Sequence, residues 1–433
     1  MRIKSIKLHN FRCFEDLNME FHPRCNVLVG KNGAGKSSIL DAVSIALGAY
    51  LNAIDGAIGS TIAQDDVHYR MYANGSIVNR EQRFPSVITT EARQYDNGNN
   101  ADLWWERSLN SSKGRTTKKN SKKITDYAKK MQEKVRRGDA DVILPMIAYY
   151  GTGRLWGKKS ERHKFKDNAP ESRLKGYQDC LLPIANERMM LNWFAKMTIL
   201  RLQEEMEIPE LSVVENAMAE CYKGIVPQAK NVRIRYSIKY GELEIQTILL
   251  NDTVEYLPLH LLSDGIRTIL NLVADIAYRM AVLNPGLLQD ILQKTPGIVL
   301  IDEIDMHLHP AWQKRILGDL CRLFPQVQFI VTTHAPSVLV NVPNEQIRVI
   351  DEYSVYTPVR KTYGRNIQAV MEELMGARVR PEDIVQKIAD INTAIDAGNL
   401  ATAENLLNEL RVKLGDDDQD VVAAQIALNL KKM

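Results

Sequence analysis

Hydrophobic positions in the first fifty residues follow a strand-like and then a helix-like spacing. Residues 3–8 and 17–21 place apolar side chains at every second or third position, which predicts two short strands with a turn between them. The apolar run at residues 26–29 predicts a buried strand. A glycine-rich turn comes next, and the spacing over residues 39–47 predicts a helix with one buried face.

The second half of the chain alternates strand and helix signals. Apolar runs at residues 297–301 and 327–331 predict buried strands, and residues 310–324 between them have helical spacing. A strand–helix–strand order implies a parallel sheet, so the expected fold class is α/β. Four further elements are expected: a strand at 142–148, a helix at 189–221, a hairpin at 232–247 and an apolar helix at 261–283.

The C-terminal segment has a helical pattern of its own. Apolar residues recur over 384–395 and 406–414, and glycines at 398 and 415 interrupt the pattern. This spacing predicts a small helical appendage. No sustained heptad is visible, which argues against long coiled-coil arms.

Composition narrows the class of protein. The chain has 433 residues, 45% hydrophobic and 25% charged, as in a soluble globular protein. No apolar run approaches the ~20 residues of a membrane helix, and the start of the chain alternates charged and apolar residues, unlike a signal or transit peptide. The five cysteines form no CxxC pair, which disfavours a disulfide framework and a zinc site. We therefore expect a cytoplasmic protein that does not contact a membrane.

Charge is unevenly distributed, although the net charge is only +3. Residues 113–137 hold eleven Lys and Arg against two acids, and residues 154–175 hold eight bases against three acids. The first stretch predicts a long mobile insertion or a helix without a strong apolar face. Both a solvated surface and a footprint for the DNA backbone fit this pattern equally well. Residues 381–433 reverse the sign, with ten acids and five bases.

A phosphate-binding motif lies between the strand at 26–29 and the helix that follows it. Residues 30–37 read GKNGAGKS and match GxxxxGK[ST]. Glycines let the backbone wrap around phosphate, and the helix N-terminus adds positive potential. We expect the lysine to reach the β- and γ-phosphates and the serine to bind Mg²⁺. The predicted ATP-binding residues here are Gly30, Asn32, Gly33, Gly35, Lys36, Ser37 and Ser38.

The ends of two later strands carry the remaining candidate catalytic residues. Asp302 and Glu303 end the strand at 297–301, and His334 follows the strand at 327–331. We expect Asp302 to hold Mg²⁺ and Glu303 to accept a proton from the attacking water. His334 is predicted to sense the γ-phosphate, although a lone histidine is more often structural.

These residues, together with LSDGIR at 262–267, resemble an ABC-type ATPase head of the RecF and SMC class. The hexapeptide looks like the LSGGQ signature motif, with Asp264 in place of the usual glycine and a divergent end. The resemblance implies that Ser263 and Gly265 bind the nucleotide held by a second subunit, so we expect a head-to-tail homodimer. Asn10-Phe11-Arg12 resembles a motif whose arginine lies near the nucleotide.

Two other positions in this chain resemble family motifs. Asp305 matches the D-loop position shortly after the Walker B strand. Gln64 is the best candidate for the Q-loop glutamine, with an ordinary surface role equally plausible.

Other segments are similar to the ATPase subunit of Septu anti-phage systems, which also occurs beside retrons. They are AYYGTGRLW at 148–156, residues 173–180, IDEIDMHLHP at 301–310 and YGRN at 363–366. The aromatic residues of the first segment more often pack than stack on bases, and the role of Arg154 stays open between phosphate contact and a structural pairing. The resemblance implies ATP and Mg²⁺ as ligands, and a separate HNH nuclease and DNA as partners.

The expected layout is an ATPase head interrupted by a helical, basic insertion. Residues 1–66 form the first part of the head, 67–225 the insertion and a helical lobe, and 226–375 the second part of the head. Residues 376–433 form an acidic tail for partner docking. A stand-alone RecF-like DNA-repair clamp is the main alternative, and a transporter subunit fits the signature poorly.

We expect no nuclease activity in this chain. Asp351-Glu352 has no spaced acidic companion, and the eight histidines form neither an HNH nor an HExxH pattern. The stretch after His334 is also too short for the Toprim domain of OLD-type nucleases, which have a similar head.

Overall fold

The computed structural model describes residues 1–74, 77–96, 99–155, 172–183, 187–376 and 380–432. Trp156 and most of the second basic stretch lie outside these residues. The chain divides into two compact units, Met1–Ile367 and Gln368–Met433. The first will be called the head unit and the second the C-terminal unit.

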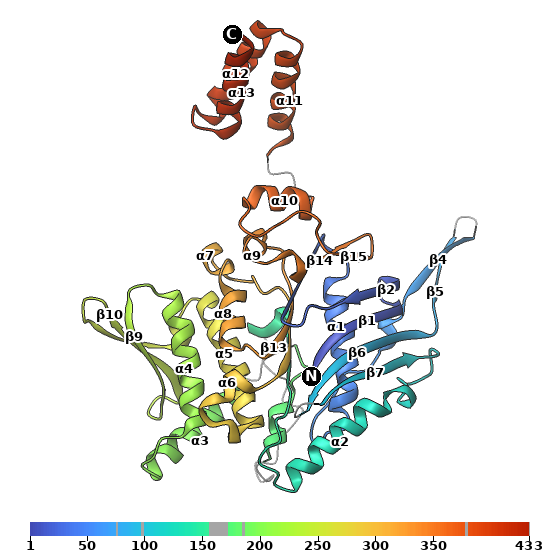
Figure 1. Ribbon diagram of the computed structural model, residues 1–433, viewed down its shortest axis with the longest axis vertical. Coiled ribbons are helices and arrows are strands. Elements are labelled where there is room, and N and C mark those ends of the chain that lie inside the picture. The colour runs from blue at the N-terminus through green and yellow to red at the C-terminus, as the bar shows by residue number, and fades with distance from the viewer. Residues whose placement is uncertain (75–76, 97–98, 156–171, 184–186, 377–379, 433) are drawn as a thin grey trace. The chain divides into compact units, whose positions relative to one another are not determined.

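The centre of the head unit is a parallel sheet (Figure 1). Four of its strands are buried on both faces, which explains why their sequences read as nearly continuous apolar runs: Cys25–Gly30, Met146–Tyr150, Gly297–Ile301 and Val327–Thr332. The edge strand Ser354–Tyr356 is largely exposed. All neighbouring strands pair in parallel except β14 and β15, which pair antiparallel at one edge of the sheet. The order is β15 (Ser354–Tyr356), β14 (Ile347–Asp351), β3 (Cys25–Gly30), β13 (Val327–Thr332), β12 (Gly297–Ile301) and β8 (Met146–Tyr150).

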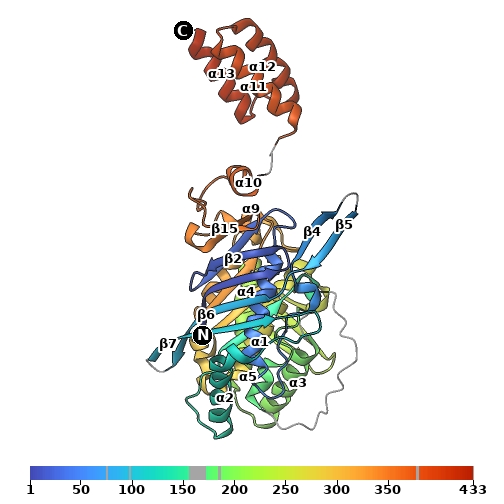
Figure 2. The same ribbon diagram turned by 90° about the vertical axis from the view of Figure 1, so that its right-hand side faces the viewer.

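An antiparallel sheet forms a second layer, which can be followed in Figure 2. Helix α1 (Lys36–Leu51) contacts both sheets and is almost wholly buried. Arg107 of β7 connects the second sheet to α1 and to the segment that follows α1. Its guanidinium donates hydrogen bonds to the carbonyl oxygens of Ile45 at 2.7 Å and Ser60 at 2.6 Å. The strand order is β2 (Phe14–Glu20), β1 (Arg2–Phe11), β6 (Ser86–Asp96) and β7 (Asn99–Leu109).

This second sheet changes the predicted layout. Residues 67–225 were expected to be an insertion, but β6 of this range pairs along β1, and β8 lies in the central sheet. The head is therefore built partly from this range. The pattern also did not predict the exposed hairpin of β4 (Tyr69–Asn74) and β5 (Ile77–Gln82). The pairing of β6 with β1 joins segments far apart in sequence and leaves no local signal, whereas the β4–β5 hairpin is a local pairing that the sequence interpretation missed.

The first basic stretch forms an ordered amphipathic helix, α2 (Lys122–Arg136). Its buried side chains lie at helical spacing and pack against α1 and β7: Ile124, Tyr127, Ala128, Met131 and Gln132. The expectation of a mobile insertion or a helix without an apolar face is thus wrong. The prediction failed because the many lysines in this stretch obscured the apolar residues that recur at helical spacing.

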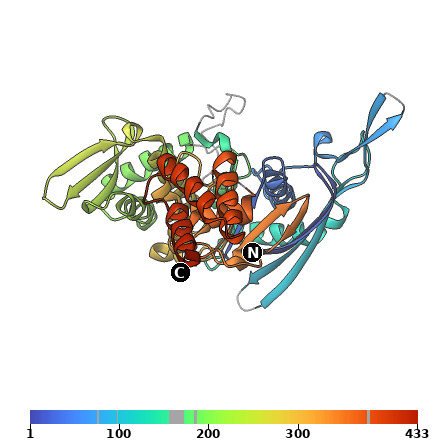
Figure 3. The same ribbon diagram turned by 90° about the horizontal axis from the view of Figure 1, so that it is seen from above.

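A helical lobe joins the central sheet to a smaller sheet of β9 (Ala229–Ser237), β10 (Glu242–Leu249) and β11 (Val254–Pro258). In Figures 1 and 3, this sheet and the β4–β5 hairpin lie at opposite ends of the head unit. From residue 187 to the end of the head unit's central sheet, the helices in chain order are α3 (Glu187–Gln203), α4 (Pro209–Ile225), α5 (Asp264–Leu283), α6 (Ile291–Lys294), α7 (Pro310–Gln313), α8 (Ile316–Leu323) and α9 (Pro336–Leu339). The predicted helix at 189–221 is two helices, because Pro209 begins a new one.

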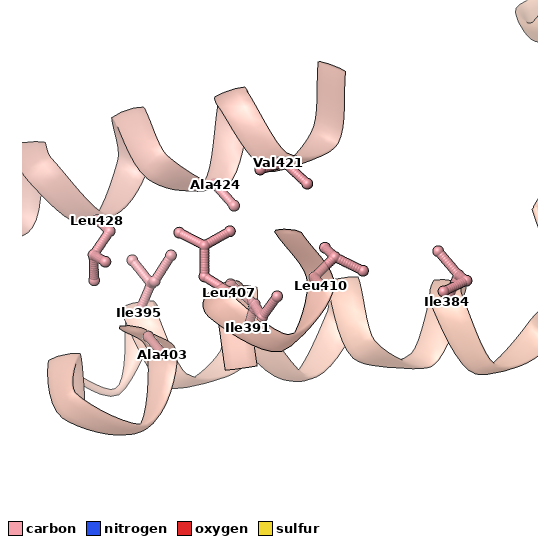
Figure 4. Packing of buried hydrophobic residues seen from close by; sticks show 9 residues of the cluster. All are labelled: Ile384, Ile391, Ile395, Ala403, Leu407, Leu410, Val421, Ala424 and Leu428. Carbon is pink, nitrogen blue, oxygen red and sulfur yellow. The ribbon is translucent and has the colours of Figure 1, made fainter. Parts of the chain in front are cut away.

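The C-terminal unit, from α10 (Ile367–Met375) onward, is helical as predicted. Helices α11 (Glu382–Asp396), α12 (Leu400–Leu414) and α13 (Gln419–Lys432) pack around a small core of aliphatic side chains (Figure 4). Gly398 and Gly415 lie at the breaks with φ of 72° and 92°, values that favour glycine. These findings confirm the predicted α/β class with a helical appendage. No helix within the described ranges is long and apolar enough to cross a membrane.

Candidate functional site

The phosphate-binding turn lies between the end of β3 and the start of α1. Gly33 and Gly35 have φ of 81° and 99°, in the left-handed region that side chains with a Cβ avoid. A Cβ on Gly35 would also lie 2.4 Å from Phe14 Cζ, and one on Gly30 would lie 2.4 Å from the Ile350 carbonyl oxygen. The glycines are therefore required by the packing of the turn as well as by its curvature.

The Lys36 amine is held inside this turn. It donates hydrogen bonds to the carbonyl oxygens of Gly30 at 2.9 Å and Lys31 at 3.0 Å. Burial lowers the pKa of Lys36, and the nearby carboxylates Asp302 and Glu303 oppose that shift. A buried cation in a phosphate-binding turn is stabilised further when anionic phosphate binds next to it.

Asp302 connects the turn to two neighbouring strand ends. Its Oδ1 accepts a hydrogen bond from the Ser37 hydroxyl at 3.1 Å and from the Thr332 hydroxyl at 2.5 Å. The Thr332 oxygen also accepts from the Glu303 N–H at 2.7 Å. One buried hydroxyl thus orients both the predicted metal ligand and the backbone of the predicted base.

The residues around Asp302 suit Mg²⁺. Carboxylate and hydroxyl oxygens are the donors that Mg²⁺ prefers, and it is usually bound by one or two carboxylates together with substrate phosphates. Within the described ranges, no group of three or more His, Cys, Asp and Glu side chains could hold a metal ion. The Ser37 hydroxyl and the Asp302 carboxylate are donors of the preferred kind and lie 3.1 Å apart beside the phosphate-binding turn, so they fit a Mg²⁺ site that phosphate oxygens would complete.

Glu303 and His334 leave adjacent strand ends. Glu303 has a left-handed backbone with φ of 48°, a strained conformation that is common at functional sites. The His334 N–H donates to Asp305 Oδ1 at 3.3 Å, and the Thr333 hydroxyl donates to the same oxygen at 2.5 Å. The predicted D-loop carboxylate thereby joins the segment after β12 to the segment after β13.

Arg12 lies beside α1 and binds two carboxylates. It forms ion pairs with Asp41 of α1 and with Asp66, the latter at 2.8 Å. Asp41 also accepts a hydrogen bond from the Tyr149 hydroxyl at 2.9 Å. Arg12 thus has a structural contact that the sequence did not indicate. Asp41 was missed because its partners lie on distant elements and it belongs to no short motif. Tyr149 lies in the segment at 148–156, whose aromatic residues were expected to pack, and its hydrogen bond to Asp41 was not predicted.

The signature residues form a separate group at the start of α5. Ser263 is the exposed N-cap residue of this helix. A Cβ on Gly265 would lie 2.4 Å from the His307 carbonyl oxygen, so the glycine lets the helix pack against the segment after β12. Asp264, which replaces the usual glycine, forms an ion pair with Arg267 at 2.7 Å.

Two of the remaining predicted residues lie in or next to the phosphate-binding turn, and Gln64 lies in a separate segment. Asn32 is exposed in the turn, and Ser38 is half-buried in the first turn of α1. Gln64 lies in a short helical turn, where its carbonyl accepts from the Gln82 side chain at 2.9 Å. The catalytic and binding roles of the site residues stay predictions.

Comparison with known proteins agrees with this architecture. A family model described as "AAA domain" matches residues 5–225, and a second AAA-domain model matches residues 134–341. A retron Ec83 probable ATPase from Escherichia coli is 26% identical, with 96% of this chain and 83% of that protein covered. A Septu protein PtuA from Bacillus mycoides is 25% identical, with 81% of this chain and 40% of that protein covered.

Among solved structures, the SMC head bound to the C-terminal winged-helix domain of ScpA has a TM-score of 0.48 and 17% identity. It covers 83% of this chain and 98% of that chain. The retron and Septu relatives confirm the resemblance seen in the sequence. The chain belongs to the AAA-domain family.

Proposed function

We propose that this chain is the ATP-binding and ATP-hydrolysing regulatory subunit of a bacterial anti-phage defence complex, acting with a separate HNH nuclease that cuts DNA. Similarity to a retron ATPase and to the Septu protein PtuA supports the proposed role in defence. The observation that carries the ATPase role is the hydrogen-bonded group of Ser37, Asp302, Thr332 and Glu303 around the phosphate-binding turn.

The residues of the candidate site have distinct tasks in the proposed reaction. Lys36 and the backbone of the turn bind the β- and γ-phosphates, while Ser37 and Asp302 would hold Mg²⁺, which would supply positive charge to the phosphates. Glu303 accepts a proton from water as the water oxygen bonds to the γ-phosphorus and the bond to ADP breaks. His334 contacts the γ-phosphate and reports its presence.

A second copy of the chain completes each site in this proposal. Ser263 and Gly265 at the N-terminus of α5 supply a further phosphate-binding surface. Since each chain has one turn and one signature segment, two copies facing head to tail form two complete sites. ATP would then hold the copies together, and hydrolysis would release them.

Replacing Glu303 tests the ATPase role. We expect Glu303→Gln to lower kcat at least about 100-fold, because the water loses its proton acceptor. ATP binding should persist and an ATP-dependent dimer should accumulate, as measured by calorimetry and light scattering. Glu255→Gln, at an exposed position of β11, is the matched control and should match wild type. Unchanged turnover in Glu303→Gln would contradict the assignment.

The nuclease is proposed as a separate subunit, and this chain is proposed to have no nuclease activity. Affinity purification of the tagged chain from its native host should recover an HNH protein in stoichiometric amount, identified by mass spectrometry. Recovery of the chain alone, or with replication and repair proteins, would instead favour the RecF-like clamp.

The basic face of α2 is the observation that favours the RecF-like alternative. Opposite the buried stripe, this helix exposes Lys122, Lys123, Lys129, Lys130 and Arg136, of which Arg136 pairs with Asp55. Clustered cations of this kind suit the DNA backbone. DNA contact is compatible with both functions, so only the partner experiment separates them.

A further inference from the structure

Helix α13 of the C-terminal unit is apolar on two opposite faces. One face points into the core of the unit, where Val421, Ala424 and Leu428 are almost fully buried (Figure 4). The other face carries Val422, Ile426 and Leu430, whose exposed fractions are 42%, 55% and 67%. A surface helix normally has one apolar face and one polar face. The second apolar face of α13 is therefore the exception that needs an explanation.

The exposed residues form a continuous ridge, which will be called the α13 ridge: Val422, Ile426 and Leu430. They are spaced four residues apart, so their side chains stack on one line of the helix surface. The small residue Ala423 lies beside the ridge and is also exposed. By contrast, Val412 on α12 is a single exposed apolar residue, which is common on protein surfaces.

We propose that the α13 ridge packs against the same ridge of a second copy of this chain, with the two helices antiparallel. The ridge is symmetric about its middle residue, so a two-fold axis at Ile426 places Val422 of each copy opposite Leu430 of the other. Isologous dimers require this self-complementarity. Ridges formed by every fourth residue also interlock in the commonest class of helix packing, at about −50°.

Charge favours the antiparallel arrangement. The N-terminal end of α13 stays net negative, because Asp417, Asp418 and Asp420 face one cation, Arg380, which pairs with the latter two. Its C-terminal end stays net positive, because Lys431 and Lys432 face one carboxylate, Glu404, which pairs with Lys432. Antiparallel packing brings the acidic end of one helix to the basic end of the other, and the two helix dipoles also align favourably. Parallel packing would instead place like charges together at both ends.

The ridge is small, so the contact is weak by itself and gains strength when another contact joins the same two copies. Closure of the head units on ATP would supply such a contact. The pairing goes beyond the proposed ATPase role and does not depend on it, because it needs neither nucleotide nor nuclease.

Sedimentation equilibrium of the full chain without nucleotide tests the pairing. We expect self-association with a dimer Kd below ~500 µM, as suits a small weak interface. Ile426→Glu, which buries two carboxylates at the two-fold axis, should raise that Kd at least about tenfold. Val412→Glu introduces the same change on another exposed valine and should leave the Kd unchanged. Both variants keep the core residues, and circular dichroism melts verify that they fold.

Thiol cross-linking provides the second measurement. Ile426→Cys treated with a short bis-maleimide should give a covalent dimer above the wild-type background, whereas Val412→Cys should not. A wild-type chain that is monomeric throughout, or an Ile426→Glu variant that associates normally, would overturn the pairing. Cross-linking of Ile426→Cys only within one chain would overturn it too, and would assign the ridge to the head unit. If the wild-type chain never self-associates and Ile426→Glu loses nuclease capture, the pairing is also overturned, and the ridge is assigned to the nuclease.

Discussion

Thr332 is the residue on which the geometry of the candidate site depends most directly. Its hydroxyl is fully buried and makes two hydrogen bonds, one to Asp302 and one from the Glu303 N–H. The parallel register of β12 and β13 pairs Ile301 with Val331, so Thr332 comes opposite Asp302. A threonine at a strand end can thus be recognised as functional once the neighbouring strand is known.

Replacing Thr332 by valine removes the hydroxyl and keeps the shape. A buried polar group left without its hydrogen-bond partner costs about 1–3 kcal/mol. In this variant the Asp302 carboxylate and the Glu303 N–H each lose the hydrogen bond to Thr332. We expect Thr332→Val to lower kcat about 10- to 100-fold while ATP affinity changes little. Thr332→Ser restores the hydroxyl and should recover most of the rate. Steady-state ATPase measurements check both, and equal kcat values for valine and serine would show that the hydroxyl does not act.

The element scale is illustrated best by α2, whose two faces carry different information. The buried face packs against α1 and β7, which makes the helix part of the head. The cations on the opposite face, including Lys122, Lys123, Lys129 and Lys130, are exposed. The helix thus combines a structural role with a surface that suits a polyanion.

Charge reversal on α2 tests DNA binding. We expect Lys129→Glu with Lys130→Glu to weaken binding to duplex DNA at least about tenfold and to reduce its salt dependence, because each phosphate contact contributes about 0.9 to the log–log slope. Lys223→Glu with Lys239→Glu makes the same charge change at exposed positions of α4 and of the turn between β9 and β10. Fluorescence anisotropy at several salt concentrations provides the measurement. Equal losses in both double variants would indicate a general charge effect.

At the scale of the whole molecule, the predicted ATP site and the acidic helices lie in different compact units. All predicted ATP-site residues belong to the head unit, and the acidic helices belong to the C-terminal unit. The C-terminal unit has a core of its own, formed by residues such as Ile391, Leu407 and Leu410. A folded unit with a core of its own and an acidic surface suits protein docking.

Deleting residues 381–433 should therefore separate ATP hydrolysis from partner docking. We expect the truncated chain to retain ATPase turnover within about twofold, because no predicted catalytic residue is lost. Capture of the HNH nuclease from the native host should fail. ATPase assays and quantitative mass spectrometry measure the two effects. Retained capture would move the docking surface to the head unit.

The sequence by itself determined the features that are local. The phosphate-binding turn, Asp302-Glu303 and the alternation of buried strands and helices are contiguous patterns, and their chemistry requires particular residues at fixed spacing. The helical appendage follows from spacing and glycine breaks in the same way.

Only the tertiary structure decided which of these patterns meet. The contact of Gly265 with His307 and the Arg12–Asp41 pair join residues that are far apart in sequence. The pairing of β6 with β1 also joins distant segments, because residues 12–85 separate the two strands. This pairing makes β6, which lies in the expected insertion, a part of the head. Such contacts depend on register and packing between elements, and the free energy of those interactions is not encoded in any short stretch of chain.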